Sequence, residues 1–250
     1  MAHSERPHPN RRELLRAGSL ASLALMASSL PRHARGQTTT PLKVGIIGSG
    51  HIGSTIGSLW VKAGHPVMFS SRHPEELASL VEGLGANAKA GTVADAIAFG
   101  DAILIAVPYK AYPQIGQDFG SQLKGKVVLD AGNATAARDG EILNEVREEG
   151  IGVTSAKYLP GAHIVRAFNA ISYKVFASEA NRSGDRMAIP LAGDDKDALT
   201  VASNLVHDAG FDPVIVGPLA RAMDFAQGGP LYGQQNTAEQ LRQKLEAMKK

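Results

Sequence analysis

The segment Gly-Ser-Gly-His-Ile-Gly at residues 48–53 has the glycine spacing of a dinucleotide-binding loop, and it lies between a continuous apolar run and a helical pattern. In such a loop Gly48 permits the tight turn, Gly50 lets a pyrophosphate approach the backbone, and Gly53 lets the following helix pack closely. The helix N-terminus adds unpaired N–H groups and the positive end of a dipole. The segment therefore predicts a phosphate-binding loop. The residues between its glycines, expected to share in cofactor binding, are Ser49, His51 and Ile52.

The residues after the second expected strand indicate which dinucleotide the loop accepts. An NAD site usually has Asp or Glu about 20 residues beyond the glycine loop, where the carboxylate binds the ribose 2′-hydroxyl. This chain has Ser71 and Arg72 there. A hydroxyl and a guanidinium suit a 2′-phosphate, which a carboxylate would repel. The sequence therefore predicts NADP, and the alternative is a polar turn that contains an arginine by chance.

Other catalytic constellations are weak. The chain has no cysteine, which excludes disulfides, thiolate zinc sites and cysteine nucleophiles. Asp194 and Asp195 follow an expected strand and precede an expected helix, so a helix cap is favoured over a metal site. No serine–histidine–acid arrangement indicates a hydrolase. We therefore predict no metal site and identify no dedicated acid–base residue.

From Leu42 onward, short apolar runs alternate with helical patterns, as in a Rossmann-type α/β fold with a doubly wound, mostly parallel sheet. A continuous apolar run such as 42–47 is typical of a parallel strand buried on both faces. Strands are expected at 42–47, 66–69, 102–107, 126–129, 164–168, 187–191 and 214–216. Helices are expected at 51–63, 74–84, 92–99, 196–209 and 235–248.

Residues 1–36 have the order of a twin-arginine-type signal peptide. The pair Arg11-Arg12 precedes an apolar stretch at 17–30, and a small-residue run at 34–36 resembles a cleavage site. The apolar stretch is shorter than the ~20 residues that span a bilayer, so no stable membrane span is expected. These features predict a bacterial protein exported by the twin-arginine machinery to the periplasm or beyond, with residues 37–41 as a linker. An uncleaved N-terminal tail is the alternative.

The charge balance gives no sign of a nucleic-acid partner. The whole chain has a formal net charge of +2, but residues 1–36 contain six arginines and only two glutamates. The remainder is therefore slightly acidic and forms no basic stripe of the kind that binds nucleic acid. We expect a small-molecule electron donor or acceptor as the partner. A homodimer is also compatible with the sequence.

An ordered set of motifs runs from about Lys43 to Tyr232. It comprises GSGHIGSTIG at 48–57, SSRHPEEL at 70–77, AVPYKA at 106–111, VVLDAGNAT at 127–135, LPGAHIVRAFNAIS at 159–172, LAGDD at 191–195, AGFDPVIVGPLARA at 209–222 and GGPLY at 228–232. With these motifs the chain resembles the NADPH-dependent deazaflavin (coenzyme F-420) reductases, also called deazaflavin-dependent NADP oxidoreductases.

This resemblance implies an NADP-binding Rossmann domain at 42–159 and a smaller C-terminal lobe at 160–250 that completes the cleft. It also implies hydride transfer between nicotinamide and a deazaflavin or flavin ring, which depends on close stacking more than on an acid or base. Met223 and Ala226 stand where the family is expected to have Arg and Glu. The residues implied to lie near the nicotinamide are Val107, Pro108, Asn133, Phe168 and Asn169.

Two other functions are compatible with the sequence. One is a non-catalytic module that binds, delivers or senses NADP. The other is a reductase of a small imine or keto substrate, a class that shares the fold but has an additional helical dimerisation domain. Oxidation of NADPH by a defined acceptor would separate these classes.

Overall fold

The computed structural model describes residues 41–249, so the predicted signal peptide at 1–36 and nearly all of the linker at 37–41 lie outside the described range. The strands are β1 (Val44–Ile47), β2 (Val67–Ser70), β3 (Ala88–Gly91), β4 (Ala102–Ile105), β5 (Val127–Asp130), β6 (His163–Arg166), β7 (Ala188–Gly193) and β8 (Asp212–Gly217). The α-helices are α2 (His51–Lys62), α3 (Ala78–Leu84), α4 (Val93–Phe99), α5 (Tyr112–Leu123), α6 (Ala136–Asp139), α7 (Ile142–Glu149), α8 (Ile151–Tyr158), α9 (Tyr173–Glu179), α10 (Lys196–Asp208) and α11 (Ala238–Ala247). Short 3₁₀ turns are η1 (Pro74–Leu77), η2 (Tyr109–Ala111) and η3 (Leu219–Asp224).

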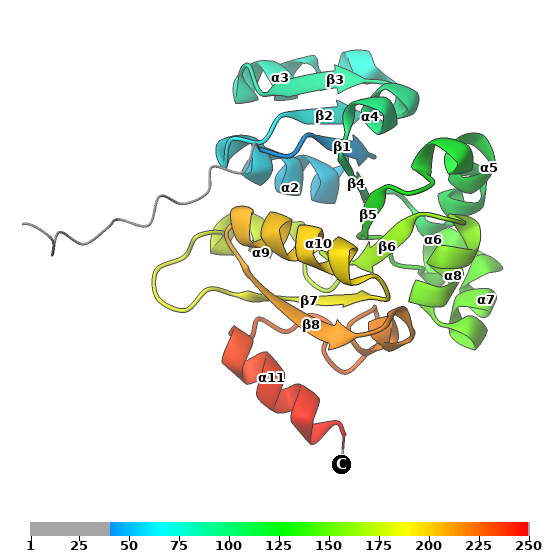
Figure 1. Cartoon of the computed structure of the whole chain (residues 1–250), viewed down its shortest axis with the longest axis vertical. Helices are drawn as coiled ribbons and strands as arrows, with labels where there is room; N and C mark the ends of the chain where they lie inside the picture. The colour runs from blue at the N-terminus through cyan, green and yellow to red at the C-terminus, as the bar shows by residue number, and fades with distance from the viewer. Residues whose placement is uncertain (1–40, 250) are drawn as a thin grey trace, which may run out of the picture. The chain divides into compact units, whose positions relative to one another are not determined.

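The strands form one eight-stranded sheet in the order β3-β2-β1-β4-β5-β6-β7-β8, and Figure 1 shows this order from β3 at the top to β8, with α11 beyond it. Its first six strands have the Rossmann order, which reverses direction between β1 and β4. All pairs are parallel except β6 with β7. The sheet continues across the domain boundary predicted between residues 159 and 160. The doubly wound, mostly parallel fold is therefore confirmed.

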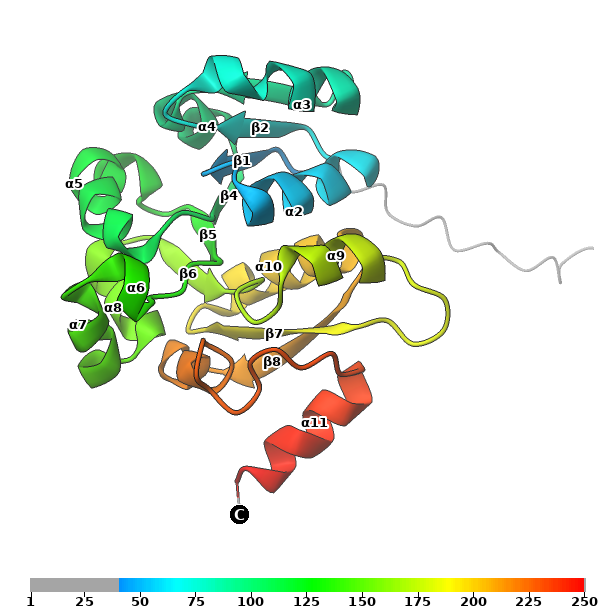
Figure 2. The same cartoon turned by 180° about the vertical axis from the view of Figure 1, so that it is seen from behind.

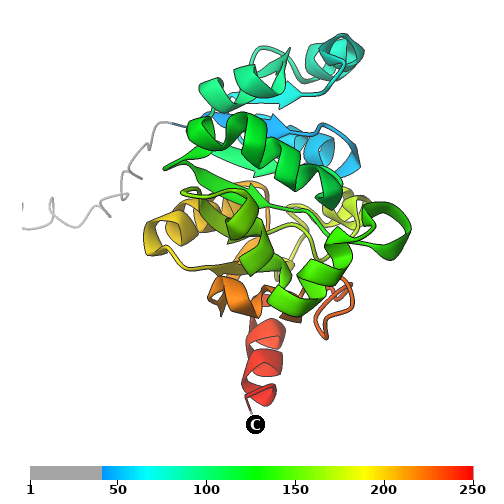
Figure 3. The same cartoon turned by 90° about the vertical axis from the view of Figure 1, so that its right-hand side faces the viewer.

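Helices cover the sheet in two layers (Figures 2 and 3). In one layer α2 contacts α3, α9 and α10, and in the other α5 contacts α4 and α8. Because β1 and β4 lie between these layers, all their residues are buried, as their apolar sequences predict. Trp60 on α2 is also buried, and its indole N–H donates to the Leu205 carbonyl of α10 at 2.7 Å.

Several elements were not predicted, for identifiable reasons. The edge strand β3 is only partly buried and contains Lys89, so it lacks a continuous apolar run. Helices α6 to α8 are short and are separated by Gly140 and Gly150, which interrupt any long helical period.

Two further predictions are confirmed. Asp195 caps α10 by accepting a hydrogen bond from the Ala198 N–H at 2.8 Å, and α11 occupies most of the expected terminal helix.

No helix between residues 41 and 249 combines the length and the apolar character needed to cross a bilayer. Within the same range, no group of three or more His, Cys, Asp or Glu side chains is arranged to hold a metal ion.

The turn between β1 and α2 depends on two glycines. Gly48 has a φ of 95°, in the left-handed region that side chains disfavour. A Cβ on Gly53 would lie only 2.1 Å from the Gly48 carbonyl oxygen, so α2 packs directly on the turn. These contacts fix where the N-terminus of α2 points.

We expect Gly53→Ala to lower the free energy of unfolding by roughly 1–3 kcal/mol, because the added methyl overpacks the turn. Gly83→Ala in α3 is the matched control. Nothing lies within 4 Å of its added Cβ, and it should gain about 0.5–1 kcal/mol from helix propensity. Urea denaturation followed by circular dichroism measures both changes. Equal stability of the two variants would contradict the packing argument.

Candidate functional site

The glycine loop is fastened to the end of β2. The backbone N–H of Ser49 donates to the Ser70 carbonyl at 3.0 Å, and the Ser49 hydroxyl donates to the same oxygen at 3.1 Å. This contact brings the loop beside Ser71 and Arg72, although about 20 residues separate them in the chain. Gly50 has open space around its Cβ position, unlike the packed Gly48 and Gly53.

A first cavity of about 850 Å³ opens at this point and includes Gly48, Ser49, Gly50, Ser71 and Arg72 in its wall. It lies outside the carboxyl ends of β1 and β4, where open α/β sheets bind ligands. Arg72 is exposed. The other charged residues of the wall are the cations Lys110 and Arg138 and the carboxylates Glu76 and Asp118.

A second cavity of about 430 Å³ adjoins the first, and both include Val107, Pro108 and Arg138. Its wall contains no aspartate or glutamate among residues 41–249. His51, at the start of α2, stacks on Tyr173, at the start of α9, with ring centroids 4.3 Å apart and planes within 8°. The other predicted residues that this wall brings together are Ile52, Asn133, Phe168 and Asn169.

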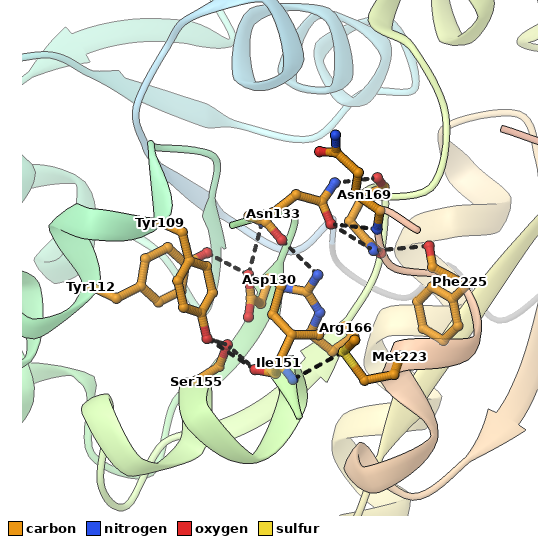
Figure 4. Close-up of polar contacts among 12 residues, drawn as sticks. Tyr109, Tyr112, Asp130, Asn133, Ile151, Ser155, Arg166, Asn169, Met223 and Phe225 are labelled. Atoms are coloured by element: carbon orange, nitrogen blue, oxygen red, sulfur yellow. Dashed lines mark hydrogen bonds and ion pairs between the residues drawn. The ribbon is translucent and has the colours of Figure 1, made fainter. Parts of the chain in front are cut away.

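The side-chain amides of Asn133 and Asn169, in the wall of the second cavity, connect three loops by hydrogen bonds (Figure 4). The Asn133 Nδ2 group donates to the Asn169 carbonyl at 2.7 Å, and its Oδ1 accepts from the Gln227 N–H at 3.4 Å. Asn169 Nδ2 donates to the Phe225 carbonyl at 3.3 Å. Asn169 is 4% exposed, and its Oδ1 has no hydrogen-bond partner among the described residues.

Phe168 contributes to the same wall, yet its side chain is buried. The ring packs edge-on against Trp60, Phe176 and Phe211. Its φ of 58° is in the left-handed region, which is costly for a bulky residue. The aromatic packing therefore turns the backbone so that Asn169 can reach the cavity.

A third cavity of about 520 Å³ adjoins the second at Asn133, Thr135 and Gln227. Its wall combines apolar side chains with the polar Asn133, Thr135 and Gln227, and the only charged side chain in it among the described residues is the exposed Arg147 of α7. Apolar members of the wall are Ala134, Ala136, Leu143, Val146, Ile151, Met223 and Ala226.

A fully buried ion pair supports the loop that carries Asn133 (Figure 4). Arg166 Nη1, at the end of β6, lies 2.7 Å from Asp130 Oδ1, at the end of β5, and both side chains are 0% exposed. Gly132 bonds to both partners: its N–H donates to Asp130 Oδ1 at 2.9 Å, and its carbonyl accepts from Arg166 Nη2 at 2.6 Å. The pair therefore fixes the peptide that leads into Asn133.

Two stacked tyrosines complete this buried cluster. The Tyr112 hydroxyl donates to Asp130, and the Tyr109 hydroxyl donates to the Ile151 carbonyl at 3.0 Å. Burial, reinforced by the Asp130 charge, raises the pKa of both phenols well above the ordinary value. Burial alone would lower the pKa of Arg166, but the charge and hydrogen bond of Asp130 together with the two neighbouring tyrosines outweigh it, so the pKa is raised. The arginine stays charged and the tyrosines stay neutral at neutral pH.

The structure places twelve of the thirteen predicted binding residues in the walls of the first two cavities. Gly53 is the exception, because it serves the packing of α2. Their roles in binding stay predictions. Sequence reasoning missed Lys110, Arg138, Tyr173 and Gln227, which lie outside the glycine loop and β2 and belong to no general binding motif.

Comparisons with known proteins indicate a class of enzyme and a fold. Residues 43–134 match the family described as "NADP oxidoreductase coenzyme F420-dependent", a segment that runs from β1 to the loop after β5. The chain is 30% identical over 187 residues to metalloreductase STEAP3 of Rattus norvegicus, an alignment that covers 73% of this chain and 35% of that protein. The chain thus spans about a third of that relative.

Solved structures share the fold. A hypothetical protein from Sinorhizobium meliloti superposes with a TM-score of 0.68 at 29% identity, covering 79% of this chain and 95% of that one. A provisionally assigned F420-dependent NADP-reductase from Arthrobacter sp. fb24 superposes with a TM-score of 0.63 at 18% identity, covering 78% and 99%.

We expect Arg166→Met to lower the free energy of unfolding by about 3–5 kcal/mol, because it leaves the Asp130 carboxylate buried without its counter-charge. The double variant Asp130→Asn/Arg166→Met removes both charges and should recover most of that loss. Urea denaturation of the wild type, both single variants and the double variant gives the coupling energy. Additive effects of the two substitutions would contradict this account.

Proposed function

We propose that this protein is an NADP(H)-dependent oxidoreductase that transfers a hydride between the nicotinamide and a deazaflavin or flavin-like acceptor. The observation that carries the proposal is the continuous series of three cavities along the carboxyl edge of the sheet. The first begins at the glycine loop, the second adjoins it at Val107 and Pro108, and the third adjoins the second at Asn133 and Gln227. The family match of residues 43–134 supports the same class of reaction.

The first cavity suits the adenosine half of NADP. The N-terminus of α2 directs N–H groups and a positive dipole end toward the site expected for the pyrophosphate. Arg72 and Ser71 lie where the 2′-phosphate of the adenosine ribose would reach the end of β2. This arrangement favours NADP over NAD, since the wall offers no carboxylate at the end of β2 for a ribose hydroxyl.

The second cavity suits the nicotinamide. Its wall has amides, aromatic rings and backbone groups but no carboxylate among the described residues. Hydride transfer between two rings requires close, aligned stacking more than a proton donor or acceptor. The chain's own contribution is therefore positioning, through the linked amides of Asn133 and Asn169. No residue is assigned as an acid or base.

The third cavity suits the acceptor. It adjoins the expected nicotinamide position, its wall combines apolar side chains with the polar Asn133, Thr135 and Gln227, and it has room for a planar ring system. Arg147 at its edge could bind an anionic substituent of the acceptor. Met223 and Ala226 occupy positions where the deazaflavin reductases that this chain resembles are expected to have Arg and Glu. Other residues would therefore have to bind the polar groups of the acceptor in this protein.

An acceptor screen tests this function. NADPH oxidation is followed at its absorbance band with coenzyme F-420, FMN, FAD, riboflavin and ferric chelates offered singly. We expect turnover with at least one ring acceptor. Gly50→Val is the control, because a Cβ at this position meets no protein atom within 4 Å, while the side chain would occupy the position expected for the pyrophosphate.

Each outcome of the screen is informative. Tight NADPH binding with no oxidation by any acceptor would identify a non-catalytic binding module instead. Turnover with small imines or ketones alone would identify the other class of reductase. Activity that persists in a folded Gly50→Val variant would contradict binding at the glycine loop.

Arg72→Ala should weaken NADPH binding by about 10- to 150-fold, the effect of roughly 1.5–3 kcal/mol for a hydrogen bond to a charged group. NADH lacks the 2′-phosphate and should change much less. Ser71→Asp in the same background should weaken NADPH further and offer a carboxylate to the ribose hydroxyls. Calorimetric dissociation constants for both cofactors, at one salt concentration, measure these changes. A wild type that prefers NADH would contradict the assignment.

We further propose that the protein is exported by the twin-arginine route, which translocates folded proteins. The proposal rests on the sequence order in residues 1–36, which lie outside the described range. Replacing Arg11 and Arg12 together by Lys should leave the protein in the cytoplasm. Cell fractionation with a cytoplasmic marker measures the distribution. Unchanged export of the double variant would refute this route.

A further inference from the structure

The carboxylate of Asp139, at the end of α6, ties together the loops that follow β4 and β5. Its side chain is 0% exposed. It accepts hydrogen bonds from the Lys110 N–H at 3.1 Å and from the Thr135 N–H at 2.7 Å. Burial alone would raise the pKa of Asp139, but the hydrogen bonds from Arg138, Thr135 and Lys110 hold it below the ordinary value. The carboxylate is therefore ionised at neutral pH.

This carboxylate holds the guanidinium of Arg138 in one orientation. Arg138 Nε donates to Asp139 Oδ2 at 3.1 Å and Nη2 donates to the same oxygen at 3.0 Å. Nη2 also donates to the Asn133 carbonyl at 2.5 Å. No hydrogen bond of Nη1 occurs within the described part of the chain, and the side chain is 43% exposed. The fork is thus preorganised, with donor capacity left over.

Arg138 lies where the first two cavities meet, since it contributes to the walls of both. The glycine loop also spans this junction, because Gly50 belongs to the first wall and His51 to the second. The loop follows β1 and Arg138 follows β5, with β4 between them in the sheet. A ligand that passes from one cavity to the other therefore has the glycine loop on one side and a guanidinium on the other.

We propose that Arg138, positioned by Asp139, binds the pyrophosphate of the dinucleotide from the side of β4 opposite the glycine loop. The inference rests on the proposed function, since it needs the adenosine half in the first cavity and the nicotinamide in the second. The pyrophosphate joins these halves, so it occupies the junction. Its charge favours the guanidinium, whose Nη1 N–H groups are left for charge-assisted hydrogen bonds to phosphate oxygens because Nε and Nη2 are bonded to Asp139 and Asn133.

A purely structural role for Arg138 makes a different prediction. If its only task were to hold Asp139 and the Asn133 carbonyl, removing it would destabilise the α6 region, and dinucleotides would lose affinity only to the extent that this region is destabilised. A role at the pyrophosphate also differs from that of Arg72. NADPH and NADH share the pyrophosphate, whereas only NADPH has the 2′-phosphate.

The test compares dissociation constants for NADPH and NADH at one ionic strength in wild type, Arg138→Gln, Arg138→Lys and Arg72→Ala. Arg138→Gln should weaken both cofactors by a similar factor of about 10- to 100-fold. Arg138→Lys keeps the charge but not the fork and should lose less. Arg72→Ala should weaken mainly NADPH. Arg242→Gln, an exposed arginine on α11 outside these cavities, is the control and should change neither.

Thermal melts establish that each variant is folded. Unchanged affinities in a folded Arg138→Gln, or a loss confined to NADPH, would overturn the inference while leaving the proposed function in place. If Arg138→Gln does not fold, Arg138→Lys decides: a parallel loss for both cofactors supports the inference, and wild-type affinities overturn it. A wild type that binds neither dinucleotide overturns the proposed function and this inference with it.

Discussion

The ion pair between Asp130 and Arg166 is the constraint on which the candidate site depends. A buried pair of charges is costly to break, because removing one partner leaves the other without its counter-charge. Here Asp130 Oδ2 and the Nε and Nη1 groups of Arg166 have no hydrogen-bond partner in the described chain, so the pair is held by its opposite charges and by the bonds of Gly132 to both partners. These contacts fix the ends of β5 and β6 relative to each other. The loop after β5 begins at this ion pair, and its Asn133 contacts the neighbouring loops. Asn133 belongs to the walls of both the second and the third cavity.

The charged groups are distributed unequally over the three cavities. The first cavity has charged side chains of both signs, the second has Arg138 among amides and aromatic rings, and the third has Arg147 and the polar Asn133, Thr135 and Gln227 among apolar side chains. Among the described residues, carboxylates therefore lie in the wall of the first cavity alone. The region where two rings would meet in the proposed reaction has no carboxylate that could act as an acid or base. Positioning, rather than proton transfer, is the chemistry that such a layout supports.

The sequence predicted those features whose physical cause is local. The turn at Gly48 and the packing at Gly53 follow from backbone geometry that only glycine supplies easily, and the apolar run of β1 follows from burial on both faces. Arg138 could not be found in this way. Its place depends on a buried carboxylate one residue away and on the Asn133 carbonyl earlier in the same connection, and neither contact has a sequence pattern. The resemblance predicts Phe168 near the nicotinamide, but the sequence does not predict that its side chain is buried. The ring packs in the aromatic cluster with Trp60 and Phe176.

Two local costs coincide in the segment 168–169. Phe168 has a left-handed backbone, which costs on the order of 1–3 kcal/mol for a residue that is not glycine. Next to it, Asn169 has a buried Oδ1 without a partner in the described chain, a comparable cost. The surrounding aromatic cluster is well packed, so poor packing does not explain these costs. Strain and unused hydrogen-bonding capacity persist where the rest of the structure imposes them, and such places are commonly binding sites. Their coincidence at the wall of the second cavity favours the segment 168–169 as the part of the site that orients the reacting ring in the proposed transfer.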